Sequence, residues 1–151
     1  MQRLCLYVLL LAAAACRYPC TGTSGLAVHF TGYSEMEIQP FVIYRYTKGS
    51  GFQAPLDSVV VDSSRARFRS SGDSLRMGIT DGGVLLQPRY DYEVFLPVPN
   101  RRYQVSELLE EPAEGVQFPG SRGPQCVNPI TAARVNGLPA LVSREELWLR
   151  K

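Results

Sequence analysis

Residues 130–142 read Ile-Thr-Ala-Ala-Arg-Val-Asn-Gly-Leu-Pro-Ala-Leu-Val, and this stretch indicates the fold class most clearly. Two short apolar runs flank the pair Asn136-Gly137. An Asn-Gly pair in that position favours a type I′ turn, because both central residues of such a turn adopt positive φ. The stretch therefore predicts a β-hairpin in which 130–135 pairs with 138–142.

Outward from this hairpin, short runs with strand character fill most of the chain. The clearest is 26–31, where Leu26, Val28 and Phe30 fall on one face at period two. A strand of this kind buries one side chain in two. The further predicted strands cover 41–46, 57–62, 65–69, 74–79, 84–86, 90–96 and 102–109, with an Asp81-Gly82 turn signal before 84–86.

About nine short strands with frequent turns and no long amphipathic helix predict an all-β domain. We expect an antiparallel sandwich of the immunoglobulin-like or prealbumin-like kind. A small β-barrel is the alternative, because a sequence carries no information on closure. Near the end of the chain, Ser143 to Glu146 fits a capping box for a helical turn and Leu147 to Leu149 fits a strand, so both stay open.

The composition is that of an ordinary globular protein, with 151 residues of which 45% are hydrophobic and 20% charged. The 13 Gly and 11 Pro, set among short apolar runs, favour a turn-rich β fold. The formal net charge of +2 argues against a nucleic-acid surface and against a strongly acidic partner. None of these figures determines the oligomeric state.

Residues 1–15 have the pattern of a secretory signal peptide. Arg3 precedes an uncharged apolar run from Leu4 to Ala15 that ends in small side chains. The run is shorter than the roughly 20 apolar residues of a permanent membrane span, and it lacks the polar face of a core helix. We therefore expect export, with residues 16–25 as a tether and 26–151 as a single β domain.

The segment Ala13-Ala14-Ala15-Cys16 resembles the lipobox of bacterial lipoproteins, in which a peptidase cuts before a cysteine that carries lipid. Ala13 stands where Leu is usual, so ordinary cleavage within the alanine run stays open. The cysteine count favours lipidation of Cys16. Cys5 leaves with the signal peptide, and an unmodified Cys16 would add a third thiol and leave one unpaired in an oxidising compartment.

With Cys16 acylated, Cys20 and Cys126 remain as an even pair, and we predict a disulfide between them. Pairing of these thiols with other chains stays open. Residues 110–128 are rich in Gly, Pro and charge and show no periodicity, which predicts one long loop. The disulfide would fasten this loop and the tether to the β domain.

Candidate catalytic groups are few. The single histidine, His29, lies opposite the core face of its predicted strand, so we interpret it as a surface side chain. One His and two free Cys match no zinc-ligand spacing. Asp91 and Glu93 share one strand face about 7 Å apart, and we interpret them as solvated acids facing basic neighbours such as the Arg65 row. We therefore predict no enzyme activity, metal or cofactor.

Two surface patterns remain. Arg65, Arg67 and Arg69 alternate with Ala66 and Phe68, which predicts a half-buried strand with a solvent-exposed basic face. Tyrosine and arginine also interleave in three places, and outside the cytoplasm such rows suit partner proteins or sugars. The same tyrosines also suit packing within half-buried strands. The possible ligand surface comprises Tyr44, Tyr46, Tyr90, Tyr92 and Arg102.

Three sets of segments from residue 41 onward carry a resemblance, namely 44–49, 90–97 with 100–103, and 126–130 with 135–137. As a set they resemble the uncharacterised small envelope lipoproteins of Gram-negative bacteria. The resemblance implies the envelope address and a small β domain, and it brings no activity. Arg17 and Tyr18 follow Cys16 directly, with no Asp and no acidic run, which by analogy with lipoprotein sorting signals favours the periplasmic side of the outer membrane over inner-membrane retention or surface display.

These observations predict an exported, lipid-anchored accessory or scaffold protein that contacts another envelope protein and is not an enzyme. The alternative is a glycan- or peptide-binding module that uses the tyrosine and arginine rows. The alternative locations are secretion and the cell surface. A flat apolar patch would favour the first hypothesis, and an exposed aromatic row beside a concave surface would favour the second.

Overall fold

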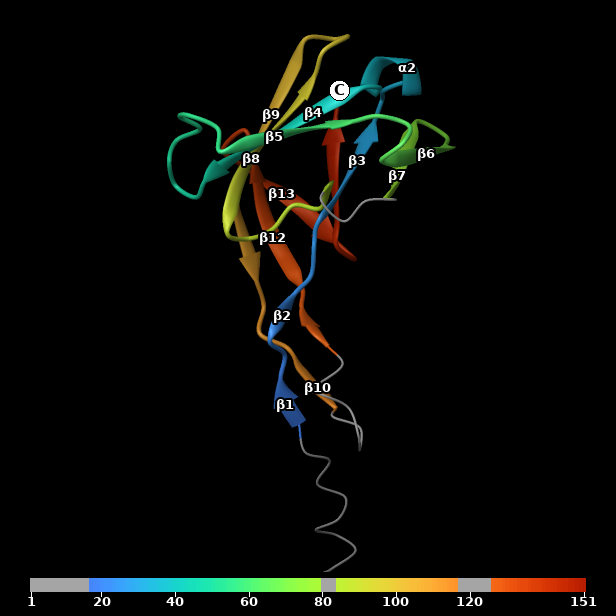
Figure 1. The fold of residues 1–151 in the computed structure, drawn as a ribbon. Coiled ribbons are helices and arrows are strands. Elements are labelled where there is room, and N and C mark those ends of the chain that lie inside the picture. The colour runs from blue at the N-terminus through green and yellow to red at the C-terminus, as the bar shows by residue number, and fades with distance from the viewer. Residues whose placement is uncertain (1–16, 80–83, 117–125) are drawn as a thin grey trace, which may run out of the picture. The chain divides into compact units, whose positions relative to one another are not determined.

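The structure is a computed structural model that describes residues 17–79, 84–116 and 126–151. These residues divide into two compact units, one of 17–22 with 112–116 and 126–128, the other of 23–79 with 84–111 and 129–151. Strands dominate both units, so the predicted all-β class is confirmed (Figure 1). Residues 112–116 and 126–128 had been assigned to the single β domain, and they group with the N-terminal segment instead.

The second unit is built on one ten-stranded sheet with the strand order β5-β4-β8-β9-β12-β13-β14-β3-β7-β6. All neighbouring pairs with a described register are antiparallel except β14 and β3, which run parallel. The expectation of a purely antiparallel arrangement is therefore wrong for this pair. The strands are β3 (Ala27–Thr31), β4 (Phe41–Thr47), β5 (Asp57–Val61), β6 (Ala66–Ser71), β7 (Ser74–Ile79), β8 (Tyr90–Leu96), β9 (Arg101–Glu110), β12 (Ile130–Val135), β13 (Leu138–Ser143) and β14 (Glu146–Arg150).

The core of the second unit forms because alternate residues of these strands are apolar. Leu26, Val28 and Phe30 are fully buried, which confirms the predicted core face of β3. The Phe30 ring packs edge-on against that of Phe41, with centroids 5.4 Å apart. Val94 and Leu96 of β8 and Val105 of β9 continue the same core.

The predicted hairpin at 130–142 is present as β12 and β13. Asn136 and Gly137 have φ of 51° and 78°, as a type I′ turn requires. The Asn136 side chain accepts a hydrogen bond from the Gln104 N–H at 2.9 Å, which fastens the turn to β9. The local sequence therefore predicts both strands and the turn of this hairpin correctly.

The capping box expected at Ser143 to Glu146 is not a helix start. Arg144 and Glu145 both have positive φ and form a tight turn, so Ser143 and Glu146 pair across the β13–β14 hairpin. The helix α2 (Glu35–Ile38) lies elsewhere and was not predicted. Its first residue follows Ser34, whose backbone N–H donates to the Glu37 carboxylate at 2.8 Å.

The segment 84–86 was predicted as a strand and is not one. Leu86 makes only an isolated antiparallel bridge to Leu26, with hydrogen bonds of 2.9 and 3.0 Å in the two directions. Val84 and Leu86 are nevertheless buried, so their apolar character reflects burial rather than strand pairing. The Asp81-Gly82 turn signal lies outside the described residues.

The first unit contains short strands where a tether and a long loop were predicted, and residues 117–125 of that loop lie outside the described residues. β1 (Arg17–Pro19) pairs antiparallel with β10 (Glu114–Val116), and Figure 1 shows the two strands side by side. β2 (Gly22–Thr23), of which Gly22 belongs to this unit, pairs with β11 (Val127–Asn128). Strands of two or three residues are too short to show a period, which is why the sequence pattern missed them.

Cys20 and Cys126 form the disulfide expected from the sequence, with their Cα atoms 5.4 Å apart. Both belong to the first unit. The Cys20 N–H also donates to the Ala113 carbonyl at 2.9 Å. The bond therefore joins the two segments that make up this unit. No helix in the described part of the chain has the length and apolar character needed to cross a membrane.

Candidate functional site

The five residues predicted as one ligand surface lie on two faces of the sheet. In the β4–β8 pairing, Tyr44 is opposite Glu93 and Arg45 is opposite Tyr92. Paired residues of neighbouring strands point to the same side, so Tyr44 and Tyr92 point to opposite sides. Tyr46 and Arg102 share the side of Tyr44, and Tyr90 shares that of Tyr92. The register therefore does not bring the five together.

Two of the four tyrosines are also buried, so the expectation of an exposed aromatic row is wrong. Tyr46 is 6% exposed and packs edge-on against Phe52, with ring centroids 5.5 Å apart. Tyr92 is 4% exposed, and burial raises the pKa of both phenols above its ordinary value. These tyrosines serve packing, which the β propensity of tyrosine already allows.

The acids on β8 are buried, not solvated, and they do not face the Arg65 row. Glu93 forms an ion pair with Arg102 of the neighbouring strand β9. Asp91 accepts a hydrogen bond from the Gly49 N–H at 2.7 Å. Strand alternation gave the side of the sheet correctly, but neighbouring strands and the turn after β4 cover that side. Both acids therefore have partners within the second unit rather than facing solvent.

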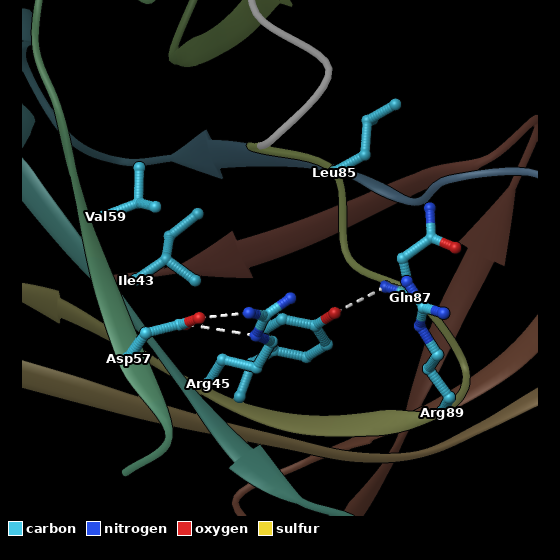
Figure 2. A pocket seen from close by; sticks show the side chains of 8 residues that line it. Ile43, Arg45, Asp57, Val59, Leu85, Gln87 and Arg89 are labelled. Carbon is cyan, nitrogen blue, oxygen red and sulfur yellow. Dashed lines mark hydrogen bonds and ion pairs between the residues drawn. The ribbon is translucent and has the colours of Figure 1, made fainter.

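A pocket of about 420 Å³ lies beside β4 and β5 (Figure 2). Arg45 forms an ion pair and hydrogen bonds with Asp57, and this partner raises the pKa of the guanidinium. The Tyr92 hydroxyl accepts a hydrogen bond from the Gln87 N–H at 2.8 Å. The lining residues are Ile43, Arg45, Asp57, Val59, Leu85, Gln87, Arg89 and Tyr92.

The chemistry of this pocket is that of polar binding. Arg45 and Arg89 lie over the Tyr90 ring, with guanidinium carbons 4.5 and 5.0 Å from its centroid. Asp57 neutralises Arg45, which leaves Arg89 as the cation with no carboxylate partner among the described residues. The lining offers hydrogen-bond donors for a small polar ligand and no paired nucleophile and base.

His29 is 4% exposed, so its interpretation as a surface side chain is wrong. Its Nδ1 accepts a hydrogen bond from the Met77 N–H at 2.8 Å, and its Nε2 lies 3.7 Å from the Glu146 carboxylate. The ring lies against Trp148, with centroids 4.8 Å apart. β3 is a central strand with neighbours on both sides, and their side chains cover the face that His29 occupies.

Burial lowers the pKa of His29 below its ordinary value of 6.5. Glu146 opposes this shift and Arg76 adds to it. An imidazole that accepts through Nδ1 carries its proton on Nε2, so His29 is neutral and held in one tautomer at neutral pH. It is a buried structural group beside a second pocket.

An exposed apolar row crosses three neighbouring strands. Leu109 of β9 is opposite Ala132 of β12, and Ala132 is opposite Leu141 of β13. Leu109 is 54% exposed and Leu141 is 80% exposed, so both side chains face solvent. Side chains paired in this way stand next to each other on one face. We call these three residues the apolar row.

The sequence held a signal for the apolar row that pattern reading missed. Residues 138–142 are apolar throughout, whereas a half-buried strand alternates apolar and polar residues. A strand that is apolar at every position carries apolar side chains on its outer face as well as on its core face. Leu141 is the residue that this signal identifies.

In the described ranges, no three His, Cys, Asp or Glu side chains cluster in a way that would hold a metal ion. Comparisons of this chain with protein-family models, with curated proteins and with solved structures find no match.

Proposed function

We propose that this chain is a lipid-anchored accessory protein of the Gram-negative envelope, without enzymatic activity, which binds another envelope protein through the apolar row. The exposure of Leu109 and Leu141 in register on one sheet face carries the proposal. Soluble monomers rarely leave apolar side chains grouped on one face unless that face meets a partner.

The surroundings of the apolar row suit a protein partner. Arg134 lies on the same strand as Ala132 and forms an exposed ion pair with Glu107 at 2.8 Å. An apolar centre with a charged margin is the usual anatomy of a protein interface. Each leucine that becomes fully buried contributes about 1.5–3 kcal/mol before the costs of association. The partner should therefore present a matching apolar surface.

The location forms part of the proposal. Residues 1–15 would direct export, Cys16 would carry the lipid, and the protein would face the periplasm from the outer membrane. The pattern of residues 3–16 supports this assignment. A Cys16→Ser variant should then move from the membrane fraction to the soluble periplasmic fraction, and an unchanged membrane fraction would contradict the anchor.

A second candidate function is a glycan- or peptide-binding module, and the pocket in Figure 2 favours it. The site differs from the predicted rows because only Tyr92 of the five predicted residues lines it. Arg89 and Gln87 would donate hydrogen bonds to a polar ligand, and Arg45 would be held in place by Asp57. Loss of glycan or peptide binding in Arg89→Ala would support this function over the first.

We further infer that the ten strands curl into a partly open barrel rather than stack as a sandwich. β5 and β6 are the outermost strands of the sheet, yet residues 62–65 connect them directly. Phe68 of β6 also packs against Phe41 of β4, with ring centroids 6.3 Å apart, so the two ends of the sheet meet. An experimental structure with β5 and β6 in separate stacked sheets would contradict this inference.

The apolar row is tested by affinity purification after crosslinking in envelope membranes. Leu109→Asp and Leu141→Asp should each lose a partner band that wild type retains, because a charge replaces the buried apolar contact. Val98→Asp is the matched control, since Val98 is 63% exposed and lies in a turn outside the row. Retention of the band in both row variants, or its loss in the control, would contradict the proposal.

A further inference from the structure

A second pocket, of about 440 Å³, gathers three arginines on the outer face of β6 and β7. Arg67 and Arg69 lie on β6, and Arg76 of β7 is directly opposite Arg69. Like charges directly opposite each other in an antiparallel pair are destabilising. The lining residues are His29, Arg67, Arg69, Arg76, Met77, Gly78 and Glu146.

The charges of the β6 arginines are not neutralised by the fold. Among the described residues, the guanidinium groups of Arg67 and Arg69 have no ion-pair or hydrogen-bond partner. The Arg76 guanidinium lies 3.7 Å from the Glu146 carboxylate, which lines the same pocket, and 5.8 Å from the centroid of the Trp148 ring. The pocket therefore retains two free guanidinium groups that can each donate paired hydrogen bonds to an oxyanion.

Room for a ligand exists because one lining residue has no side chain. Gly78 is opposite Arg67, so no side chain fills the place next to that guanidinium. His29 also lines the pocket, and its buried ring is held in place by the hydrogen bond from the Met77 N–H at 2.8 Å. The volume is that of a small-molecule site and exceeds what a lone phosphate ion fills.

The charge of the lining sets the charge of the ligand. Three arginines and one glutamate, with His29 neutral, leave a local charge of three minus one, or +2. A phosphomonoester carries about −1.5 to −2 at pH 7 and offers three acceptor oxygens. A carboxylate carries half that charge and two oxygens. The lining thus matches a phosphomonoester better than a carboxylate.

We propose that this pocket binds the phosphomonoester group of a small polar molecule, held by Arg67 and Arg69 and oriented by Arg76. This goes beyond the proposed function, because none of the three belongs to the apolar row. Binding brings an anion between Arg69 and Arg76 and so removes the repulsion across the strand pair. The phosphate has two possible sources, a soluble phosphosugar or a lipid headgroup.

Calorimetry on the full-length protein in neutral detergent micelles tests the proposal, with glucose 6-phosphate as the probe and glucose as the uncharged control. Arg69→Gln should weaken binding of the probe about tenfold or more, and Arg67→Gln/Arg69→Gln should abolish it, because each removes a charge-assisted bond. Arg144→Gln is the matched control, since it removes the same charge from an exposed turn that lines neither pocket.

A second arm distinguishes the two sources. Phosphatidic acid, or phosphatidylcholine as its control, is mixed into the micelles, and the fluorescence of Trp148 is followed, since this is the only tryptophan of the chain. A response to phosphatidic acid that depends on Arg69 assigns a lipid headgroup, and binding of glucose 6-phosphate that depends on Arg69 assigns a soluble ligand. Binding in neither arm, equal binding of glucose, or equal loss in Arg144→Gln would overturn the proposal.

Discussion

The two units of this protein are stabilised by different means. The second unit has a continuous core from ten strands, with side chains such as Phe30 and Val28 fully buried. The first unit has strands of two or three residues, and its described residues include one buried apolar side chain, that of Cys20. A unit with so little core depends on its covalent bond. The difference predicts that the units respond to different perturbations.

The largest expected effect is on the second unit. Phe30→Ala removes a fully buried ring that contacts Phe41, and we expect a loss of about 3–5 kcal/mol in the free energy of unfolding. Urea unfolding followed by Trp148 fluorescence measures it, because that tryptophan lies on β14. Leu141→Ala, at an exposed site, should change stability by less than about 0.5 kcal/mol. Equal changes in the two variants would contradict the assigned core.

The next effect should be confined to the first unit. Replacing both Cys20 and Cys126 with Ala removes the bond that joins the two segments of this unit, which has little core of its own. Hydrogen exchange measured by mass spectrometry should then speed up in peptides 17–22 and 112–116. Peptides from β3 and β14 should keep their protection. Faster exchange throughout the chain would show that the disulfide stabilises both units together.

A smaller difference in the free energy of unfolding is expected between variants of two ion pairs in the second unit. Arg102→Leu leaves the buried Glu93 carboxylate without its partner, and we expect a loss of about 1–3 kcal/mol. Arg134→Leu breaks the exposed pair with Glu107 and should cost about 0–1 kcal/mol. Urea unfolding of both variants provides the comparison. The reverse order would mean that Glu93 is solvated, as its sequence pattern alone had suggested.

The smallest effect is the pH dependence contributed by His29. Because its pKa is lowered in the folded state, protons bind more readily to the unfolded chain. The contribution of neutral His29 to the free energy of unfolding is fully present above its pKa in the unfolded chain, about 6.5. This contribution is lost as the pH falls toward the lower pKa of the folded state. Wild type should therefore lose more stability than His29→Gln between about pH 6.5 and pH 5. Parallel pH profiles would place His29 in solvent.

Sequence patterns predicted the parts of this fold that depend only on residues close together in the sequence. The Asn136-Gly137 turn and the core face at Leu26, Val28 and Phe30 needed only neighbours in sequence. The parallel pairing of β14 with β3 joins strands that lie far apart in the sequence of the unit, and no turn signal predicts such a contact. The alternation of side chains within a strand does not show which strands lie at the edges of the sheet. It also does not show where a compact unit begins and ends in the sequence.

The candidate sites show the same limit more sharply. Alternation placed His29 on the side of its strand opposite the core, and that assignment holds, since Val28 and Phe30 point the other way. It could not show that Trp148 and Arg76 come from neighbouring strands to cover that side. Period two gives the direction of a side chain, and only the neighbouring strands decide whether it meets solvent.

The most direct test of the proposed function places a photoreactive residue in the apolar row in living cells. A photoreactive phenylalanine analogue at position 141, and separately at 109, should give one covalent adduct of the same partner mass after irradiation. The same analogue at position 98, which is also exposed, should give none. Adducts of equal yield at positions 98 and 141, or no adduct at 141, would contradict the claim that this face binds a partner.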